Sequence, residues 1–252
     1  KNGSDKRTFL NRVFIQQQDS LTLDNRFCVE WLKMFINAHA RLDLNTPLLQ
    51  LTSKLFNGDN SKKKWKLVRP LEMVLTSKSV FCQEERREIF NIILNHKSTD
   101  INLLINDNHT ILYVAMKHDP YYVGQLLACA KTKVNGVLGA CYTPLLFAQY
   151  HILHLQETSP WFKTLVTFPL KNIELLLEHK NCDVTIQDSL TGFTPILFAA
   201  MTFECSKHIF ERILEIDPTQ IYAMAKDNTN LFFIGVLCNN NVLIEKIITL
   251  YV

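Results

Sequence analysis

The sequence is poor in glycine, with only 7 glycines among its 252 residues. It contains no glycine-rich loop of the kinds that bind phosphate or dinucleotide groups, and it has no H-E-x-x-H zinc motif. Its net charge of +3 and isoelectric point near 8.4 are too mild to indicate nucleic-acid binding by themselves. The usual signatures of nucleotide-dependent enzymes, zinc proteases and nucleic-acid readers are therefore missing.

Long apolar runs are also missing. The longest uncharged stretch, residues 134–156, is interrupted by Gly136, Gly139 and Pro144, whereas a membrane-spanning helix needs about 20 consecutive apolar residues. The sequence therefore predicts neither a transmembrane helix nor a signal peptide.

The composition is that of a folded chain with reduced thiols. Hydrophobic residues make up 47% and charged residues 20%, which is ordinary for a soluble globular protein with a sizeable core. The seven cysteines are odd in number and scattered, so we expect reduced thiols and a cytosolic location. The chain opens with Lys1 and stops at Val252 within a helical pattern, and we expect it to be a piece of a longer protein.

The most informative stretch is residues 188–200, DSLTGFTPILFAA. Gly192 suits a turn, Thr194 can cap a helix through its hydroxyl, and Pro195 is favoured at the first helical position. The small residues Ala199 and Ala200 allow a second helix to approach closely. This pattern predicts a turn followed by a tightly packed helix pair.

The same pattern recurs along the chain. Clear further starts are Thr110, Thr143 and Thr229, and weaker ones are Arg69-Pro70 and Thr8. The intervals between starts range from 33 to 61 residues, so we expect insertions between some of the units. A segment with helical apolar spacing follows each start, and these segments are 29–38, 89–94, 122–127, 173–177, 209–214 and 243–250.

These starts and exits resemble the ankyrin repeat, whose units open with G-x-T-P-L-H-x-A-A and close with A-D-V-N. Remnants of the closing motif are Leu42 to Asn45, Thr99 to Asn102, Val134-Asn135 and Cys182 to Thr185. The distance from Asn102 to Thr110 equals that from Asn135 to Thr143, 8 residues in each case. The resemblance covers residues 8–252 and is strongest over 99–235.

The resemblance implies an all-α fold, an ankyrin-repeat solenoid of about six helix-turn-helix repeats with short β-hairpin-like fingers, forming a single domain over residues 1–252. The sequence departs from the family where Tyr113, Leu146, Leu197 and Phe232 replace the usual histidine, and where most turn glycines are lost. The insertions and the richness in Asn, Lys and Ile are similar to those of ankyrin domains in host-directed effectors of intracellular bacteria.

Two insertions are expected. Residues 46–68 contain the turn signal Asn57 to Asn60 followed by the lysine cluster 62–66, which predicts an inserted hairpin-like finger. Residues 155–168 form the second insertion, in which Pro160, together with Pro169 just after it, prevents one continuous helix. We therefore expect the return helix to start at Pro169. A solvated loop is the first interpretation of the lysine cluster, and a phosphate or lipid site is the alternative.

Candidate chemistry is sparse. His151 and His154 can share one helix face, and Cys205 and His208 form a lone C-x-x-H, but neither pair has a third metal ligand nearby. Cys141 could pair with His151, without an acid to orient the histidine. We therefore expect no catalytic residue, no metal and no cofactor.

A binding surface is the stronger expectation. The resemblance implies that side chains just before each start, and seven and eight residues after it, face outward on the concave side, where ankyrin proteins usually bind other proteins. These residues are His109, Lys117, His118, Tyr142, Tyr150, His151, Phe193, Met201, Thr202, Asn228 and Val236. The aromatic and methionine side chains among them are enriched in binding patches. By contrast, the residues four after each start are expected in the core, namely Val114, Phe147, Phe198 and Phe233.

The sequence thus predicts a protein-protein interaction module that binds a partner protein and neither nucleic acid nor membrane. The similarity to effector arrays implies a host-directed bacterial effector domain that acts in the host cytosol. The alternative is the substrate-recruiting or regulatory part of a larger enzyme. A catalytic role for Cys141 or the histidines, and burial of the surface by the insertions, are further alternatives.

Overall fold

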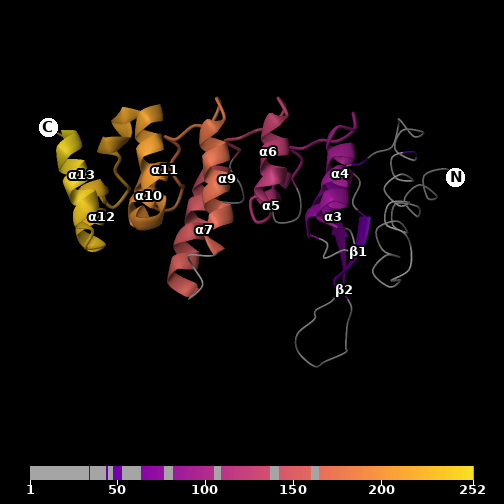
Figure 1. The fold of residues 1–252 in the computed structure, drawn as a ribbon, viewed down its shortest axis with the longest axis horizontal. Coiled ribbons are helices and arrows are strands. Elements are labelled where there is room, and N and C mark those ends of the chain that lie inside the picture. The colour runs from indigo at the N-terminus through magenta and orange to yellow at the C-terminus, as the bar shows by residue number, and fades with distance from the viewer. Residues whose placement is uncertain are drawn as a thin grey trace, which may run out of the picture. The chain divides into compact units, whose positions relative to one another are not determined.

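Helices dominate the part of the chain that the computed structural model describes, which comprises residues 34, 44, 48–52, 64–76, 82–104, 109–136, 142–159 and 165–251. The chain divides into two units, residues 1–106 and 107–252. The first contains β1 (Leu48–Thr52), β2 (Lys64–Val68), α3 (Pro70–Thr76) and α4 (Gln83–Leu94). The second contains α5 (Ile111–Ala115), α6 (Pro120–Ala128), α7 (Pro144–Thr158), α9 (Thr167–Glu178), α10 (Pro195–Met201), α11 (Phe203–Ile216), the 3-10 helix η3 (Pro218–Tyr222), α12 (Leu231–Leu237) and α13 (Asn241–Tyr251) (Figure 1).

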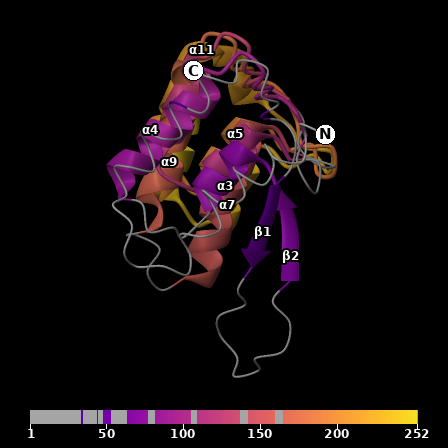
Figure 2. The ribbon, with the colours of Figure 1, turned by 90° about the vertical axis from the view of Figure 1, so that its right-hand side faces the viewer.

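The first unit combines a helix pair with a β-hairpin. Strands β1 and β2 pair antiparallel, with Leu48 opposite Val68 and Thr52 opposite Lys64, and Figure 2 shows them as two adjacent arrows. This confirms the hairpin expected within residues 46–68. Helix α4 begins with a capping box, in which Cys82 Sγ accepts from the Glu85 backbone N–H and Glu85 accepts from that of Cys82.

Some predicted features of the first unit lie outside the described residues. These are the start at Thr8, Lys62, Lys63 and, apart from Met34, the helical segment 29–38.

The second unit is a row of four helix pairs, α5–α6, α7–α9, α10–α11 and α12–α13 (Figure 1). The first helices contact their neighbours along the row, α5 with α7, α7 with α10 and α10 with α12, while α6 contacts α9 and α9 contacts α11. This arrangement confirms the predicted helix-turn-helix solenoid. Among the described residues, no helix combines the length and the apolar character needed to cross a bilayer.

The core of the second unit repeats with the starts. The residues two, five and six after each start are buried in all four first helices, and several are small enough for close helix contact. They are Leu112, Ala115, Met116, Leu145, Ala148, Gln149, Ile196, Ala199, Ala200, Leu231, Ile234 and Gly235. The same positions are thus buried in each repeat, although the residue types at these positions differ.

The helix starts follow the predicted caps closely. The hydroxyls of Thr110 and Thr143 accept from backbone N–H groups three residues on, at 3.4 and 3.3 Å, and Pro144 and Pro195 occupy first helical positions. Thr194 holds the same cap position without a side-chain hydrogen bond.

The start predicted at Thr229 is wrong by one residue, because α12 is capped by Asn230, whose Oδ1 accepts from the Phe233 N–H at 2.9 Å. A bridge between Met224 and Asn230 keeps the backbone extended through Asn230, so the helix begins later.

The second insertion is partly helical. Helix α7 continues to Thr158, so the beginning of the predicted insertion 155–168 belongs to this helix. Helix α9 begins at Thr167, two residues earlier than the expected start at Pro169. A proline is tolerated there because the N–H groups of the first helical turn have no partner within the helix. Trp161 and Phe162 lie outside the described residues.

Polar side chains tie neighbouring repeats together. Asn135, a remnant of the closing motif, donates from Nδ2 to the Asn181 carbonyl at 2.6 Å and accepts from the Asp183 N–H at 2.9 Å. Gln149 donates to the Pro195 carbonyl at 2.8 Å. These bonds fix the register between α7–α9 and the repeats on either side.

The turn before α10 is organised by Asp188. Its buried carboxylate accepts from the N–H groups of Leu190, Thr191 and Phe193 and from the Thr191 hydroxyl. Burial raises the pKa of Asp188, but these hydrogen bonds outweigh it, so the pKa is lowered overall. The turn closes at Gly192, whose φ of 77° lies in the left-handed region.

Candidate functional site

The side chains predicted to bind a partner lie on the first helices of the second unit and on the turns before and after them. Lys117, Tyr150, Asn228 and Val236 are exposed. Those that are half-buried are His109, His118, Tyr142, His151, Phe193 and Met201. Thr202 was expected to face outward, but it is buried, and its hydroxyl pairs with that of Ser206 at 2.9 Å.

Five side chains from α5, α7 and the turns on either side of α5 form one cluster, which we call the α5–α7 cluster. It consists of His109, Tyr113, Lys117, Phe147 and His151. Tyr113 stacks on His109 with ring centroids 3.9 Å apart and meets Phe147 at 4.0 Å. His151 stacks on Phe147 at 6.2 Å. Rings from two neighbouring repeats thus form one continuous aromatic surface.

A cation completes the α5–α7 cluster. The Lys117 Nζ lies 4.6 Å from the Tyr113 ring centroid and 5.4 Å from that of Phe147, within the range of cation-π attraction. Burial lowers the pKa of Lys117, and it raises the pKa of Tyr113. The pKa of His151 is lowered by burial and then by the positive charges of Lys117 and His154. At neutral pH His151 is therefore uncharged and Lys117 supplies the positive charge of the cluster.

A second aromatic contact extends this surface along α7. Tyr142, in the turn before the helix, stacks on Tyr150 at 5.3 Å with an interplanar angle of 22°. His154 meets Tyr150 edge-on at 6.4 Å. We call these three residues, together with the α5–α7 cluster, the aromatic surface.

Phe193 and Asn228 occupy the turns before α10 and α12. Phe193 packs edge-on against Phe198 at 5.3 Å, so it contributes to the packing of its own repeat. Asn228 is exposed with φ of 65°, a conformation that asparagine adopts more readily than most residues. Of these two turn residues, Phe193 therefore packs within its own repeat, whereas Asn228 is exposed to solvent.

The expected core residues divide into two groups. Phe147 and Phe198 are buried as predicted, and Val114 is half-buried. The prediction for Phe233 is wrong, because half of its side-chain surface is exposed. Helix α12 contacts α10 and α13, whereas α10 also has α7 on its other side, so fewer described helices cover the side chains of α12.

Sequence reasoning missed Tyr113 and the contact that the buried Phe147 makes with it. These residues lie three and four positions after neighbouring starts, and they meet because α5 packs beside α7. Tyr113 was noted only as a replacement for the family's histidine. Adjacent large rings at these two positions are the signal that could have revealed the cluster.

Carboxylates are concentrated on two of the second helices, α9 and α11. The first helices α5, α7, α10 and α12 contain a single carboxylate, Glu157 near the end of α7. The second helices α9 and α11 carry several, including Glu174, Glu178, Glu211 and Glu215. The aromatic surface is therefore apolar with a slight positive charge.

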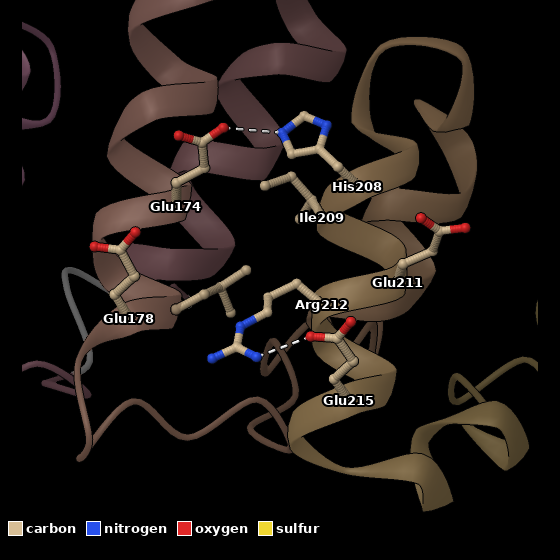
Figure 3. A pocket seen from close by; sticks show the side chains of 8 residues that line it. Glu174, Glu178, His208, Ile209, Glu211, Arg212 and Glu215 are labelled. Atoms are coloured by element: carbon tan, nitrogen blue, oxygen red, sulfur yellow. Dashed lines mark hydrogen bonds and ion pairs between the residues drawn. The ribbon is translucent and has the colours of Figure 1, made fainter.

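An open groove of about 330 Å³ lies between α9 and α11 on the second-helix layer. Figure 3 shows His208 and Arg212 of α11 reaching toward carboxylates, with His208 Nε2 3.2 Å from Glu174 and Arg212 2.8 Å from Glu215. Such exposed ion pairs contribute only about 0 to 1 kcal/mol each. Because His208 and Arg212 pair with two of its carboxylates, and Glu211 pairs with Lys246 of α13, the groove is better explained as a contact between repeats than as a ligand site.

Metal and thiol chemistry find little support. The described residues contain no group of three or more His, Cys, Asp or Glu side chains arranged to hold a metal ion. Cys205 and His208 have separate partners, the Thr202 carbonyl and Glu174. Burial, with the charge of Asp183, raises the pKa of Cys182 to about 12, so its thiol stays protonated. Cys141 lies outside the described residues.

One comparison with known proteins, that with solved structures, identifies the fold. No family model matches the sequence, and no curated protein matches it. The structure is similar to the crystal structure of EF0377, an ankyrin repeat protein, with a TM-score of 0.55 and 14% sequence identity. The match covers 90% of this chain and 98% of the other. Together with the repeated helix pairs and their common register, this similarity shows that the chain has the ankyrin-repeat fold.

Proposed function

We propose that the second unit is a protein-protein interaction module that binds its partner through the aromatic surface. The observation that supports this most strongly is the α5–α7 cluster, in which four rings and a lysine lie together on helices that carry almost no acidic residue. Tyrosine side chains offer large contact area for little loss of conformational entropy.

Mutual stacking prepares this surface for binding. Tyr142 and Tyr150 hold each other in place, as do Tyr113 and Phe147, so little side-chain freedom is lost when a partner binds. Each immobilised flexible side chain would otherwise cost roughly 0.5 to 1.5 kcal/mol. A partner segment that offers apolar groups and a carboxylate for Lys117 fits this surface best.

Site-specific photo-cross-linking tests the proposal without requiring a known partner. A photoreactive residue in place of Tyr150, exposed on α7, is expected to form adducts with the partner in a cell lysate. The matched control replaces Glu215, which is also exposed but lies on α11 in the second-helix layer. Equal adduct formation at both positions would contradict the proposal.

The source of the partner can be found with the same experiment. The compositional similarity to effector arrays supports a host protein as the partner. Adducts that form in a eukaryotic lysate but not in a bacterial lysate would support a host partner, and the reverse result would support a bacterial partner. A cytosolic location is proposed on the scattered cysteines, of which the five in the described residues are free thiols.

A recruiting role within a larger enzyme would use the same surface. It differs in its consequence, because the cross-linked protein would then be a substrate and would carry a modification introduced by the longer chain. Mass spectrometry of the captured protein separates the two functions.

A further inference from the structure

One position of the repeat register forms a row along the first helices of the second unit. It lies seven residues after each start and is occupied by Lys117, Tyr150, Met201 and Val236. Lys117, Tyr150 and Val236 are exposed, and Met201 is half-buried. Because α5 contacts α7, α7 contacts α10 and α10 contacts α12, these side chains follow one another from repeat to repeat. We call them the seven-position row.

Lys117 is the only charged member of this row, and it is held in place by rings of two repeats. Its Nζ lies 4.6 Å from the Tyr113 ring centroid and 5.4 Å from that of Phe147. Among the residues that the structure describes, no carboxylate pairs with Lys117. Glu157, the one carboxylate of the first helices, lies about two helical turns beyond Tyr150. The row therefore begins with a positioned cation that has no anion.

Other lysines of the second unit have carboxylate partners. Lys171 and Lys246 lie 2.9 and 3.0 Å from Glu174 and Glu211. Lys117 is instead partly desolvated by its neighbours, and this burial lowers its pKa. A carboxylate brought by a partner would replace the hydration that the ammonium group has lost, through a charge-assisted hydrogen bond.

The rest of the row favours a protein segment over a nucleic acid. Rings beside a lysine also occur in sites for single-stranded nucleic acids, but those sites follow the phosphate backbone with several basic side chains. Here the positions after Lys117 are Tyr150, Met201 and Val236, which carry no charge. One cation followed by apolar side chains matches a segment with one carboxylate followed by apolar side chains.

The spacing of the helices indicates the conformation of such a segment. Helices that pack side by side are about 8 to 10 Å apart. A polyproline II chain has three residues per turn and rises about 3.1 Å per residue, so every third side chain points to the same side at intervals of about 9 Å. Side chains on one face of a β-strand repeat at about 7 Å and match the helix spacing less well.

We propose that the partner binds as an extended segment across the seven-position row, with one Asp or Glu paired with Lys117 and with apolar side chains about three and about six residues away on Tyr150 and Met201. This inference rests on the proposed function, since it specifies the partner of the aromatic surface. Lys117 is then the residue that selects an acidic segment, whereas Tyr150 contacts the apolar part.

Short random peptides displayed on phage and selected against the 252-residue chain provide the probe. The enriched peptides are expected to share an acidic residue and apolar residues at the proposed spacing. Lys117→Met should weaken the binding of a selected synthetic peptide roughly tenfold. Changing the acidic residue of the peptide to its amide should cause the same loss with the wild type and little further loss with Lys117→Met. The matched control is Lys207→Met, which removes the same charge from an exposed position on α11 and should leave binding unchanged.

The possible failures of the inference and of the proposed function are distinguishable. Peptides whose binding is weakened by Tyr150→Ala but not by Lys117→Met, or that share no acidic residue, would overturn the inference and leave the proposed function in place. Selection of no peptide would also overturn it, because an extended segment needs no folded context. Peptides that bind Tyr150→Ala as well as the wild type would contradict the proposed function itself. Tighter binding of a fluorescent single-stranded oligothymidine than of any selected peptide, lost in Lys117→Met, would assign the surface to a nucleic acid.

Discussion

At the residue scale, the turn before α10 shows how two residues, Asp188 and Gly192, determine the position of a helix start. The Asp188 carboxylate accepts hydrogen bonds from backbone N–H groups of the turn, and Gly192 adopts the left-handed conformation that directs these groups toward the carboxylate. The next turn packs against this one, with the Lys226 N–H donating to the Thr191 carbonyl at 2.9 Å. The loops of neighbouring repeats therefore depend on each other.

Replacing Gly192 by alanine should destabilise the protein by about 1 to 3 kcal/mol, because the left-handed conformation is costly for residues with a Cβ. A Cβ there would also lie 2.8 Å from Lys226 Cγ and 2.9 Å from its backbone nitrogen. The matched control is Gly124→Ala in α6, where a Cβ meets nothing within 4 Å and alanine should stabilise the helix by up to about 1 kcal/mol. Urea unfolding of both variants measures the difference, and equal stabilities would refute the role of the turn.

The carboxylate of Asp188 gives a pH dependence of defined sign. Because its pKa is lowered in the folded state, its contribution to stability is fully present above the unfolded-state pKa of about 3.9 and is lost as the pH falls through the folded-state value. Asp188→Asn should therefore be less stable than the wild type at pH 7 and approach it below about pH 4. A stability difference that stays constant from about pH 7 to about pH 2 would show that hydrogen bonding by the ionised carboxylate is not the cause.

At the element scale, the helix pairs could be predicted because the threonine and proline starts reflect local backbone chemistry. The caps of Thr110 and Thr143 need only their own first turn, and Asn135 could be recognised from its place in the closing motif. The start at Thr229 was misplaced because an extended bridge beyond the motif shifts the cap to Asn230. Local sequence does not specify such a tertiary constraint.

The candidate site was predictable only in part for the same reason. Tyr142 and Tyr150 belong to one start and were identified together. The contact of Tyr113 with Phe147 joins two repeats, so it depends on how α5 packs beside α7. The exposure of Phe233 depends on which helices pack against α12, and the helical period of α12 cannot reveal this.

Two phenylalanines at the same register position provide a test of this packing scheme. Phe198→Ala should destabilise the protein by about 3 to 5 kcal/mol, because it empties a buried site between repeats. Phe233→Ala should cost less than about 1.5 kcal/mol, because half of the side chain is already in water. Chemical denaturation of the two variants compares them directly. Equal losses would contradict the assigned register.

At the scale of the second unit, the two helix layers have different surface chemistry. The first helices and the turns that flank them carry rings and a lysine, whereas α9 and α11 of the second-helix layer carry carboxylates that pair with nearby cations. Phe147 belongs to the core, but Lys117 and Tyr150 of the aromatic surface are exposed, so these two side chains can be altered while the fold is kept. This separation of fold from surface allows binding to be tested by single substitutions.

The most direct measurement is the affinity of the cross-linked partner for three proteins, the wild type, Tyr150→Ala and Tyr222→Ala. Tyr222 is a matched control, since it is also an exposed tyrosine but lies on η3, away from the aromatic surface. A central aromatic residue of an interface contributes about 2 kcal/mol, so Tyr150→Ala should weaken binding roughly thirtyfold, as measured by calorimetry. Tyr222→Ala should leave both affinity and Tm nearly unchanged. Unchanged affinity in Tyr150→Ala, or an equal loss in Tyr222→Ala, would contradict binding through the aromatic surface.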